Sequence, residues 1–178
     1  MNFQFFESLS VAEAEEFLRR FLEVESGKVE ELLRAVRAEG LLADFSLASI
    51  YSLFEWVLRR ASSVPKEPDL SLPDWIRNTS SYSQGLFEFD DFTKEAILQC
   101  AYYMGESFAR ASPILKWGIG NRDFAEQNQP VITGFRQDIE MPPILVTENI
   151  FQRVSLRGAS PTVVQSIVDY WSERIGPS

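Results

Sequence analysis

The chain has 178 residues, of which 45% are hydrophobic, and its 26 acidic and 17 basic side chains give a formal net charge of −9 at pH 7. An acidic surface repels phosphate backbones and anionic lipid headgroups, which argues against nucleic acid or a membrane surface as a partner. The sequence contains no histidine and one cysteine, so histidine-based catalysis, histidine-bearing zinc sites and internal disulfides are excluded.

The first seven residues lack the basic start and the long apolar run of a secretory signal. No segment approaches the roughly 18 uncharged apolar residues that a membrane-spanning helix requires. A lone cysteine is also typical of a reducing compartment. We therefore expect a cytoplasmic protein that does not bind a membrane.

Residues 1–60 predict a helical subdomain. A capping box begins a helix over about 11–24, a Ser-Gly pair ending at Gly27 interrupts it, and a second helix ends at Gly40. We expect these two helices to form a hairpin. Apolar side chains at helical spacing within 44–60 predict a third helix beside them.

The segment 61–91 predicts a linker or an extended wrap, because it is rich in proline and serine and has little periodicity. The remainder, 92–178, predicts an α+β subdomain that begins with a long helix over about 92–110. The apolar stripe of that helix contains Cys100. We interpret Cys100 as a small buried hydrophobe and not as a nucleophile, since the chain has no histidine to activate it.

Three short apolar runs follow the long helix, at residues 114–119, 131–135 and 144–146. Each is too short for a helix and is bounded by Gly, Asn or Pro, so together they predict a small three-stranded antiparallel sheet. Thr147 and Ser160 are then expected to begin two C-terminal helices. The chain is therefore expected to have an α+β fold, with both subdomains in one compact unit.

Acidic and aromatic side chains gather just ahead of the long helix, at Phe87, Glu88, Phe89, Asp90 and Asp91. The three carboxylates of Glu88, Asp90 and Asp91 could hold a hard cation such as Ca²⁺ or Mg²⁺, but their spacing does not match an EF-hand loop. Helix capping and dipole complementarity explain the aspartates without a ligand. Together with Tyr82, the group could instead form an exposed surface that contacts a basic protein.

Glu106 lies on the flank of the apolar stripe of the long helix. A partly buried carboxylate needs a partner, and Arg110, four residues further on, is the local candidate. A lone carboxylate seldom makes an active site, so the sequence favours a structural role for Glu106.

The segment 102–106 reads Tyr-Tyr-Met-Gly-Glu, and it is followed by Trp117 in a predicted strand and by a Pro-Val pair at 130–131. Over residues 92–175, this order resembles a loose group of small bacterial domains of unknown function, some of them similar to immunity proteins encoded beside polymorphic toxins. The resemblance implies an α+β domain in which the Tyr-Gly-Glu turn packs against the strand with the tryptophan. It implies that Glu106 and Trp117 form a structural pair, and it supplies no catalytic residues.

The first functional hypothesis is a non-enzymatic bacterial interaction protein, of which an immunity-type inhibitor is a specific form. Its contact residues would be Tyr82 and the five residues 87–91, acting on a basic protein partner. The sequence indicates neither a cofactor nor a metal site, and it leaves the oligomeric state open.

Two alternatives belong to other classes. A small-ligand binding domain or a carboxylate-based hydrolase would have a pocket beside Trp117, with Glu106 or Asp123 and with Tyr103. A purely structural subunit would be distinguished by a larger and more apolar interface than a transient complex has.

Overall fold

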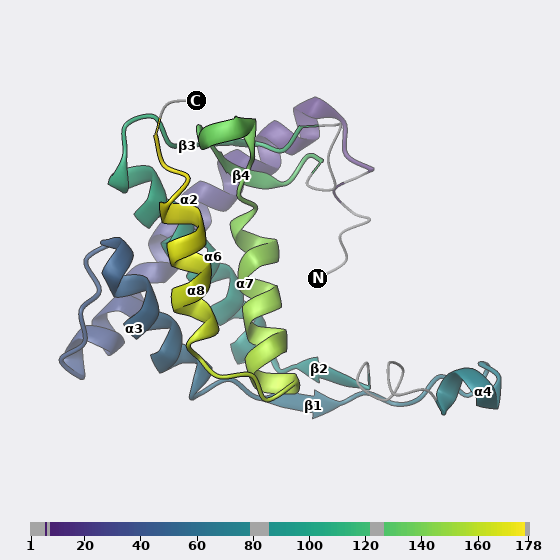
Figure 1. The fold of residues 1–178 in the computed structure, drawn as a ribbon. Helices are drawn as coiled ribbons and strands as arrows, with labels where there is room; N and C mark the ends of the chain where they lie inside the picture. The colour runs from purple at the N-terminus through teal and green to yellow at the C-terminus, as the bar shows by residue number, and fades with distance from the viewer. Residues whose placement is uncertain (1–5, 7, 79–85, 122–126, 177–178) are drawn as a thin grey trace.

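The computed structural model describes residue 6 and residues 8–78, 86–121 and 127–176 (Figure 1). Within these ranges the chain is a mixture of six α-helices and two small two-stranded antiparallel sheets. In chain order the elements are α2 (Val11–Ala38), α3 (Leu47–Leu58), β1 (Ser63–Pro65), α4 (Asp74–Arg77), β2 (Phe87–Phe89), α6 (Asp91–Ala111), β3 (Lys116–Ile119), β4 (Pro130–Thr133), the 3-10 turn η1 (Arg136–Asp138), α7 (Pro143–Phe151), the π-helical segment η2 (Gln152–Leu156) and α8 (Val163–Ser172). None of the described helices is long and apolar enough to cross a membrane.

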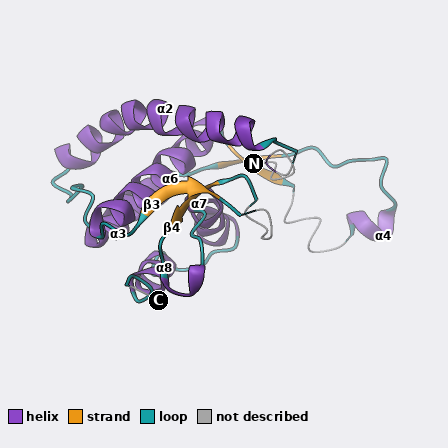
Figure 2. Cartoon of the chain, turned by 90° about the horizontal axis from the view of Figure 1, so that it is seen from above, coloured by secondary structure: helices purple, strands orange, loops and turns teal. Residues whose placement is uncertain are grey.

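Helix α6 lies at the centre of the molecule and packs against α2, α3 and α7. Figure 2 shows α2 along one side of this layer and α8 on the opposite side. One cluster of buried side chains draws on all five of these helices and on β4. Most of the apolar stripe of α6 is buried, although Phe92 at its start is 50% exposed, and Cys100 has no exposed surface, as the sequence predicts. The residues of both predicted subdomains therefore contribute to the same core.

The N-terminal helical hairpin is a wrong prediction, because α2 is one continuous helix of 28 residues. Its capping box at Ser10 is confirmed. A glycine inside a helix costs only about 1 kcal/mol relative to alanine, and the apolar positions on both sides of Gly27 lie on one buried face. The hydroxyl of Ser26 donates to the carbonyl of Glu23 at 2.9 Å, so it stays within the helical turn.

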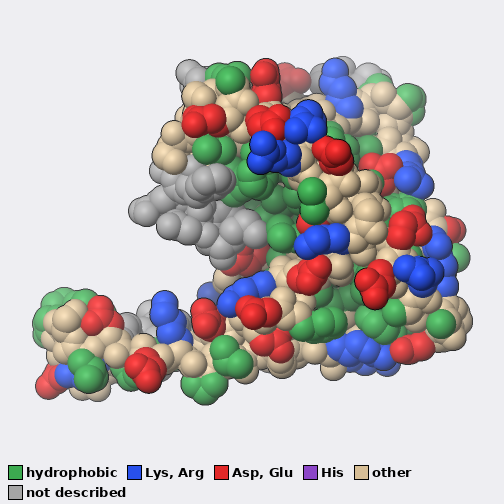
Figure 3. Space-filling view, turned by 180° about the vertical axis from the view of Figure 1, so that it is seen from behind, with side chains coloured by type: hydrophobic (Ala, Val, Ile, Leu, Met, Phe, Trp, Pro, Cys, Tyr) green, Lys and Arg blue, Asp and Glu red, His purple; other side chains and the backbone are tan. Residues whose placement is uncertain are grey.

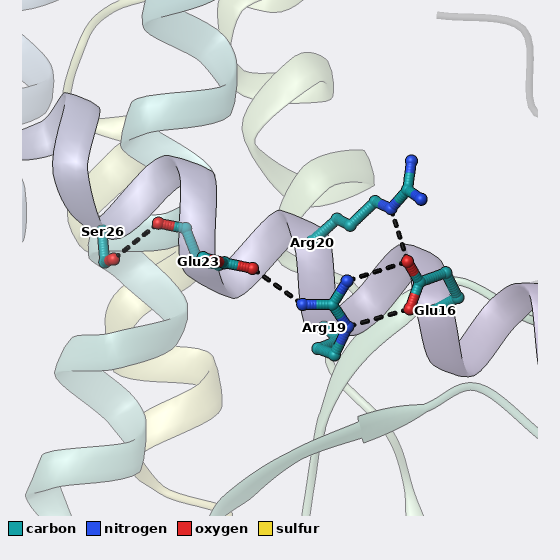
Figure 4. Close-up of polar contacts among 5 residues, drawn as sticks. All are labelled: Glu16, Arg19, Arg20, Glu23 and Ser26. Atoms are coloured by element: carbon teal, nitrogen blue, oxygen red, sulfur yellow. Dashed lines mark hydrogen bonds and ion pairs between the residues drawn. The ribbon is translucent and has the colours of Figure 1, made fainter.

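Ion pairs on the exposed face of α2 stabilise its first half, ahead of Gly27 (Figure 4). Arg19 contacts Glu16 and Glu23 at 2.8 Å, and Arg20 contacts Glu16 at 2.5 Å. Hydrogen bonds from the two arginines lower the pKa of Glu16 to about 2. Pairs at these spacings favour helix over the whole first half of α2.

The three-stranded sheet is also a wrong prediction. Strands β3 and β4 pair in antiparallel register, with Trp117 opposite Ile132, but the third apolar run lies inside α7. Met141 makes a single bridge to Ile132, through hydrogen bonds of 2.8 and 3.0 Å. Pro142 and Pro143 follow at once and have no N–H to extend a ladder, whereas proline is well suited to the first turn of a helix.

Strands β1 and β2 form a second ladder inside the segment predicted as a linker or wrap, with Ser63 opposite Phe89 and Pro65 opposite Phe87. We call the segment 63–89 the arm; its described residues are 63–78 and 86–89. The arm projects away from the helical body and carries the short helix α4 near its tip (Figure 1). In the space-filling view of Figure 3, the tip stands apart from the body and shows apolar side chains.

A buried side-chain amide joins the N-terminal residues to the start of β4. Asn128 is 2% exposed, and its side-chain N–H groups donate to the backbone carbonyls of Phe6 at 3.1 Å and Leu9 at 2.8 Å. The residue has a φ of +61°, a conformation that asparagine tolerates better than most residues. The entry into α2 is thereby held against the start of β4.

Candidate functional site

The structure brings Glu106 and Trp117 together. The indole Nε1 of Trp117 donates to Glu106 at 3.4 Å, and Nε of Arg110 donates to the other carboxylate oxygen at 2.7 Å. The Trp117 ring lies directly over Gly105, where an added Cβ would be 2.2 Å from a ring carbon. The Tyr-Gly-Glu segment is thus a stretch of helix α6, and its glycine makes room for the indole.

The polar groups of the predicted hydrolase pocket have structural partners. The hydroxyl of Tyr103 accepts a hydrogen bond from the backbone N–H of Phe45 at 3.0 Å and lies 2.5 Å from Oγ of Ser49. Glu106 is occupied by Arg110 and Trp117. Asp123, the other predicted acid, lies outside the described residues. These contacts explain the described members of the set without a substrate.

The predicted acidic and aromatic surface is divided between the core and the solvent. Asp90 caps α6, accepting from the N–H of Thr93 at 2.7 Å, and the hydroxyl of Ser62 donates to its other oxygen. The hydrogen bonds from Ser62 and Thr93 lower the pKa of Asp90. Phe89 is buried in the core. These two residues therefore serve the fold.

The other predicted contact residues remain on the surface. Phe87 is 47% exposed, and the side chain of Asp91 is fully exposed. Nζ of Lys94 lies 3.8 Å from Glu88 and 3.6 Å from Asp91, so the acidic character of this surface is partly balanced. Tyr82 lies outside the described residues.

A pocket of about 520 Å³ opens beside β2, between α6 and α7. We call it the α6–α7 pocket. Its size lies within the range of small-molecule sites, about 300 to 1,000 Å³. Five of its lining side chains are apolar and come from β2, α6 and η2: Phe87, Phe89, Ile97, Leu98 and Leu156.

Charged and polar groups also reach this pocket, two of them from the C-terminal half of the chain. Glu148 on α7 is only 8% exposed, and it accepts a hydrogen bond from Nε2 of Gln152 at 3.3 Å. At the rim, Nζ of Lys28 lies 3.1 Å from Glu95, and Lys94 lies beside Glu88. The lining thus carries three carboxylates and two ammonium groups.

No local pattern in the sequence predicts this pocket, because its polar residues lie on four separate segments that meet only when α2, α6 and α7 pack together. Periodicity places each of them on a helix but does not say which helices are neighbours. Among the described residues, no three acidic or thiol side chains come together as possible metal ligands.

A second surface feature lies on the arm. Four of the ten most exposed large hydrophobic side chains of the described chain belong to it: Val64, Leu70, Trp75 and Phe87. Leu70 and Trp75 have the highest exposed fractions, 75% and 73%. The sequence analysis did not predict a role for either residue. Leu70 lies between Pro68 and Pro73, and Trp75 follows Pro73 by two positions; large apolar residues in such an aperiodic stretch are a usable signal of an exposed apolar surface.

Comparison of the chain with protein families, with curated proteins and with solved structures gave no match.

Proposed function

We propose that this chain is a non-enzymatic protein-binding module that contacts a basic protein through the arm. The observation that carries the proposal is the exposure of Leu70 and Trp75 on a segment that projects from the body. Tryptophan is among the residues that contribute most to protein interfaces, and contiguous exposed apolar surface marks interaction sites.

The construction of the arm supports the same proposal. A two-stranded ladder alone is marginally stable in water and gains stability when another surface covers it. The β1–β2 ladder has three paired positions, and beyond them the chain continues to α4, whose four residues include none that is buried. A partner that covers the tip would bury Trp75 and stabilise the ladder together.

The negative charge of the chain favours a basic partner. The chain carries a net charge of −9, and Glu88 and Asp91 are exposed at the root of the arm. A basic partner would associate faster with such a surface, and the association rate would fall as salt rises. Of the contact residues expected from the sequence, Phe87, Glu88 and Asp91 are retained in this proposal.

Site-specific crosslinking in the source cell tests the proposal directly. A photoreactive amino acid replaces Trp75 in one variant and Val24 in another; Val24 is 50% exposed on α2, far from the arm along the chain. We expect one basic protein to be crosslinked at position 75 and not at position 24. The same crosslinked proteins at both positions, or none at position 75, would contradict the proposal.

Affinity measurements with the crosslinked partner follow. Removal of an interface anchor costs about 2 kcal/mol or more, which corresponds to roughly 30-fold weaker binding. We expect this loss for Trp75→Ala and less than about twofold for Val24→Ala, with circular dichroism showing that both variants are folded. Equal affinities for the two variants would rule out the tip as the binding element.

An immunity-type inhibitor is the specific form of this proposal that the sequence resemblance implies. A toxin reading frame next to the gene would supply the basic partner. Co-expression of the wild-type chain should then protect cells from that toxin, and Trp75→Ala should protect less. Equal protection by the two proteins would argue against this form.

A further inference from the structure

We propose that the α6–α7 pocket binds an organic cation with an apolar body, such as an arylalkylamine. This inference does not rest on the proposed function, because the pocket lies at the root of the arm while the interaction anchor lies at its tip. The enclosing residues come from α2, α6, α7 and η2 of the helical body and from β2 at the root of the arm.

The walls select an apolar body. Five of the eleven lining residues are large hydrophobic side chains, and all of them except Phe87 belong to the core cluster or pack against it. Pockets for small molecules combine such walls with a small number of polar groups that fix the orientation of the ligand. An alkyl or aryl group that fills this space is bound favourably because apolar surface of the ligand and of the wall is removed from water.

The charges select a cation. Lys28 is paired with Glu95, and Lys94 lies beside Glu88, so each ammonium group in the lining already has a carboxylate close by. Glu148 adds a third carboxylate, and it is the most buried charged side chain of the lining. The lining therefore carries one more negative than positive charge.

An anionic ligand of the same shape would meet two obstacles. It would have to displace Glu95 from Lys28 or Glu88 from Lys94 to obtain a cationic partner, and it would bring a negative charge close to the buried Glu148. Like-charge contacts in a partly desolvated site disfavour binding of such a ligand. An ammonium group, in contrast, can donate to Glu148 while Gln152 keeps its own hydrogen bond to the same carboxylate.

The test compares three probes of nearly one shape: 4-phenylbutylamine, 4-phenylbutanol and 4-phenylbutyrate. Binding to the purified wild-type chain is followed by amide chemical shifts in NMR titrations. We expect saturable binding of the amine, at least tenfold tighter than that of the alcohol, with the largest shifts in α6 and α7. Tighter or equal binding of the butyrate, or no saturable binding of the amine, would overturn the proposal.

A substitution locates the charge that matters. Glu148→Gln keeps the shape of the side chain and should weaken binding of the amine at least tenfold while leaving the alcohol unchanged. Glu15→Gln makes the same change in net charge on the exposed start of α2, 13 residues from Lys28 or about 20 Å along the helix, and should bind the amine like the wild type. Equal amine affinities for the two variants would overturn the proposal.

The two proposals can fail separately. Trp75→Ala should bind the amine with wild-type affinity, because Trp75 does not line the pocket. Loss of amine binding in this variant would contradict the pocket assignment. A failed crosslink at position 75 would contradict the proposed function but not the pocket assignment, because the amine titrations use the purified chain alone.

Discussion

Replacement of Gly105 by alanine tests whether the contact between α6 and Trp117 is as close as the structure shows. The new Cβ would lie 2.2 and 2.3 Å from two ring carbons of Trp117, whereas ordinary carbon contacts are about 3.5 to 4 Å. The ring cannot move away freely. Its indole N–H is bonded to Glu106, and its faces and edges meet Phe21 and Tyr102, with centroid separations of 5.7 and 6.4 Å.

The expected change in the free energy of unfolding for Gly105→Ala follows from two opposing effects. Alanine in place of glycine inside a helix stabilises it by about 1 kcal/mol. An added methyl group in a close-packed core costs about 1 to 3 kcal/mol or more, and the upper value applies here because the obstacle is a rigid ring held on several sides. We therefore expect Gly105→Ala to lower the free energy of unfolding by about 2 kcal/mol, that is, about 3 less about 1.

Gly27→Ala is the matched control. This glycine also lies inside an α-helix, and a Cβ placed on it would meet nothing within 4 Å. The free energy of unfolding should therefore rise by about 0.5 to 1 kcal/mol. Urea titrations followed by far-ultraviolet circular dichroism measure both variants. If Gly105→Ala proves as stable as Gly27→Ala, the packing of Trp117 against α6 is incorrect.

Three further predictions concern buried polar groups. Burial raises the pKa of Glu25 above its ordinary value of 4.5, so the folded state keeps a proton that the unfolded state has released, and the contribution of Glu25 to stability falls as pH rises above about 4.5; Glu25→Gln, which does not titrate, should therefore gain stability relative to wild type as pH rises in urea titrations, and a constant difference would contradict this. Tyr103→Phe leaves the N–H of Phe45 and the hydroxyl of Ser49 without their shared partner and should cost about 1 to 2 kcal/mol; an unchanged urea midpoint would show that these hydrogen bonds contribute nothing. Burial also raises the pKa of the Cys100 thiol, which should resist a thiol-specific disulfide reagent in the folded chain and react fully in urea; rapid labelling of the folded chain would show that the site opens.

Local signals in the sequence predicted the starts of α2 and α6, but not that of α7, because Thr147 lies inside that helix, which begins at Pro143. Ser10 and Asp90 cap α2 and α6 as their residue types predict, because a capping hydrogen bond joins residues only three positions apart. Gly27 shows the limit of this reasoning. A single glycine lowers helix propensity, but a continuous buried face on both sides outweighs it, and that face exists only once α2 has packed on α6.

Features that depend on distant pairing could not be read from local patterns. The β1–β2 ladder joins Ser63 to Phe89 across 26 positions of sequence, most of which have no periodicity. The α6–α7 pocket depends on the meeting of Lys28 and Glu148, which are 120 positions apart. The prediction of a third strand is wrong for a different reason: the two prolines at 142–143 bound the short apolar run as a loop would, but proline also begins helices.

The amide of Asn128 has a consequence for the order in which the chain folds. It closes a loop of about 120 residues by holding Phe6 and Leu9, and closure of so long a loop is entropically unfavourable until much of the intervening chain is ordered. Contacts of such sequence separation slow folding. We expect this junction to form in the last kinetic step and to open first in native-state hydrogen exchange, before the amides of α6 lose protection.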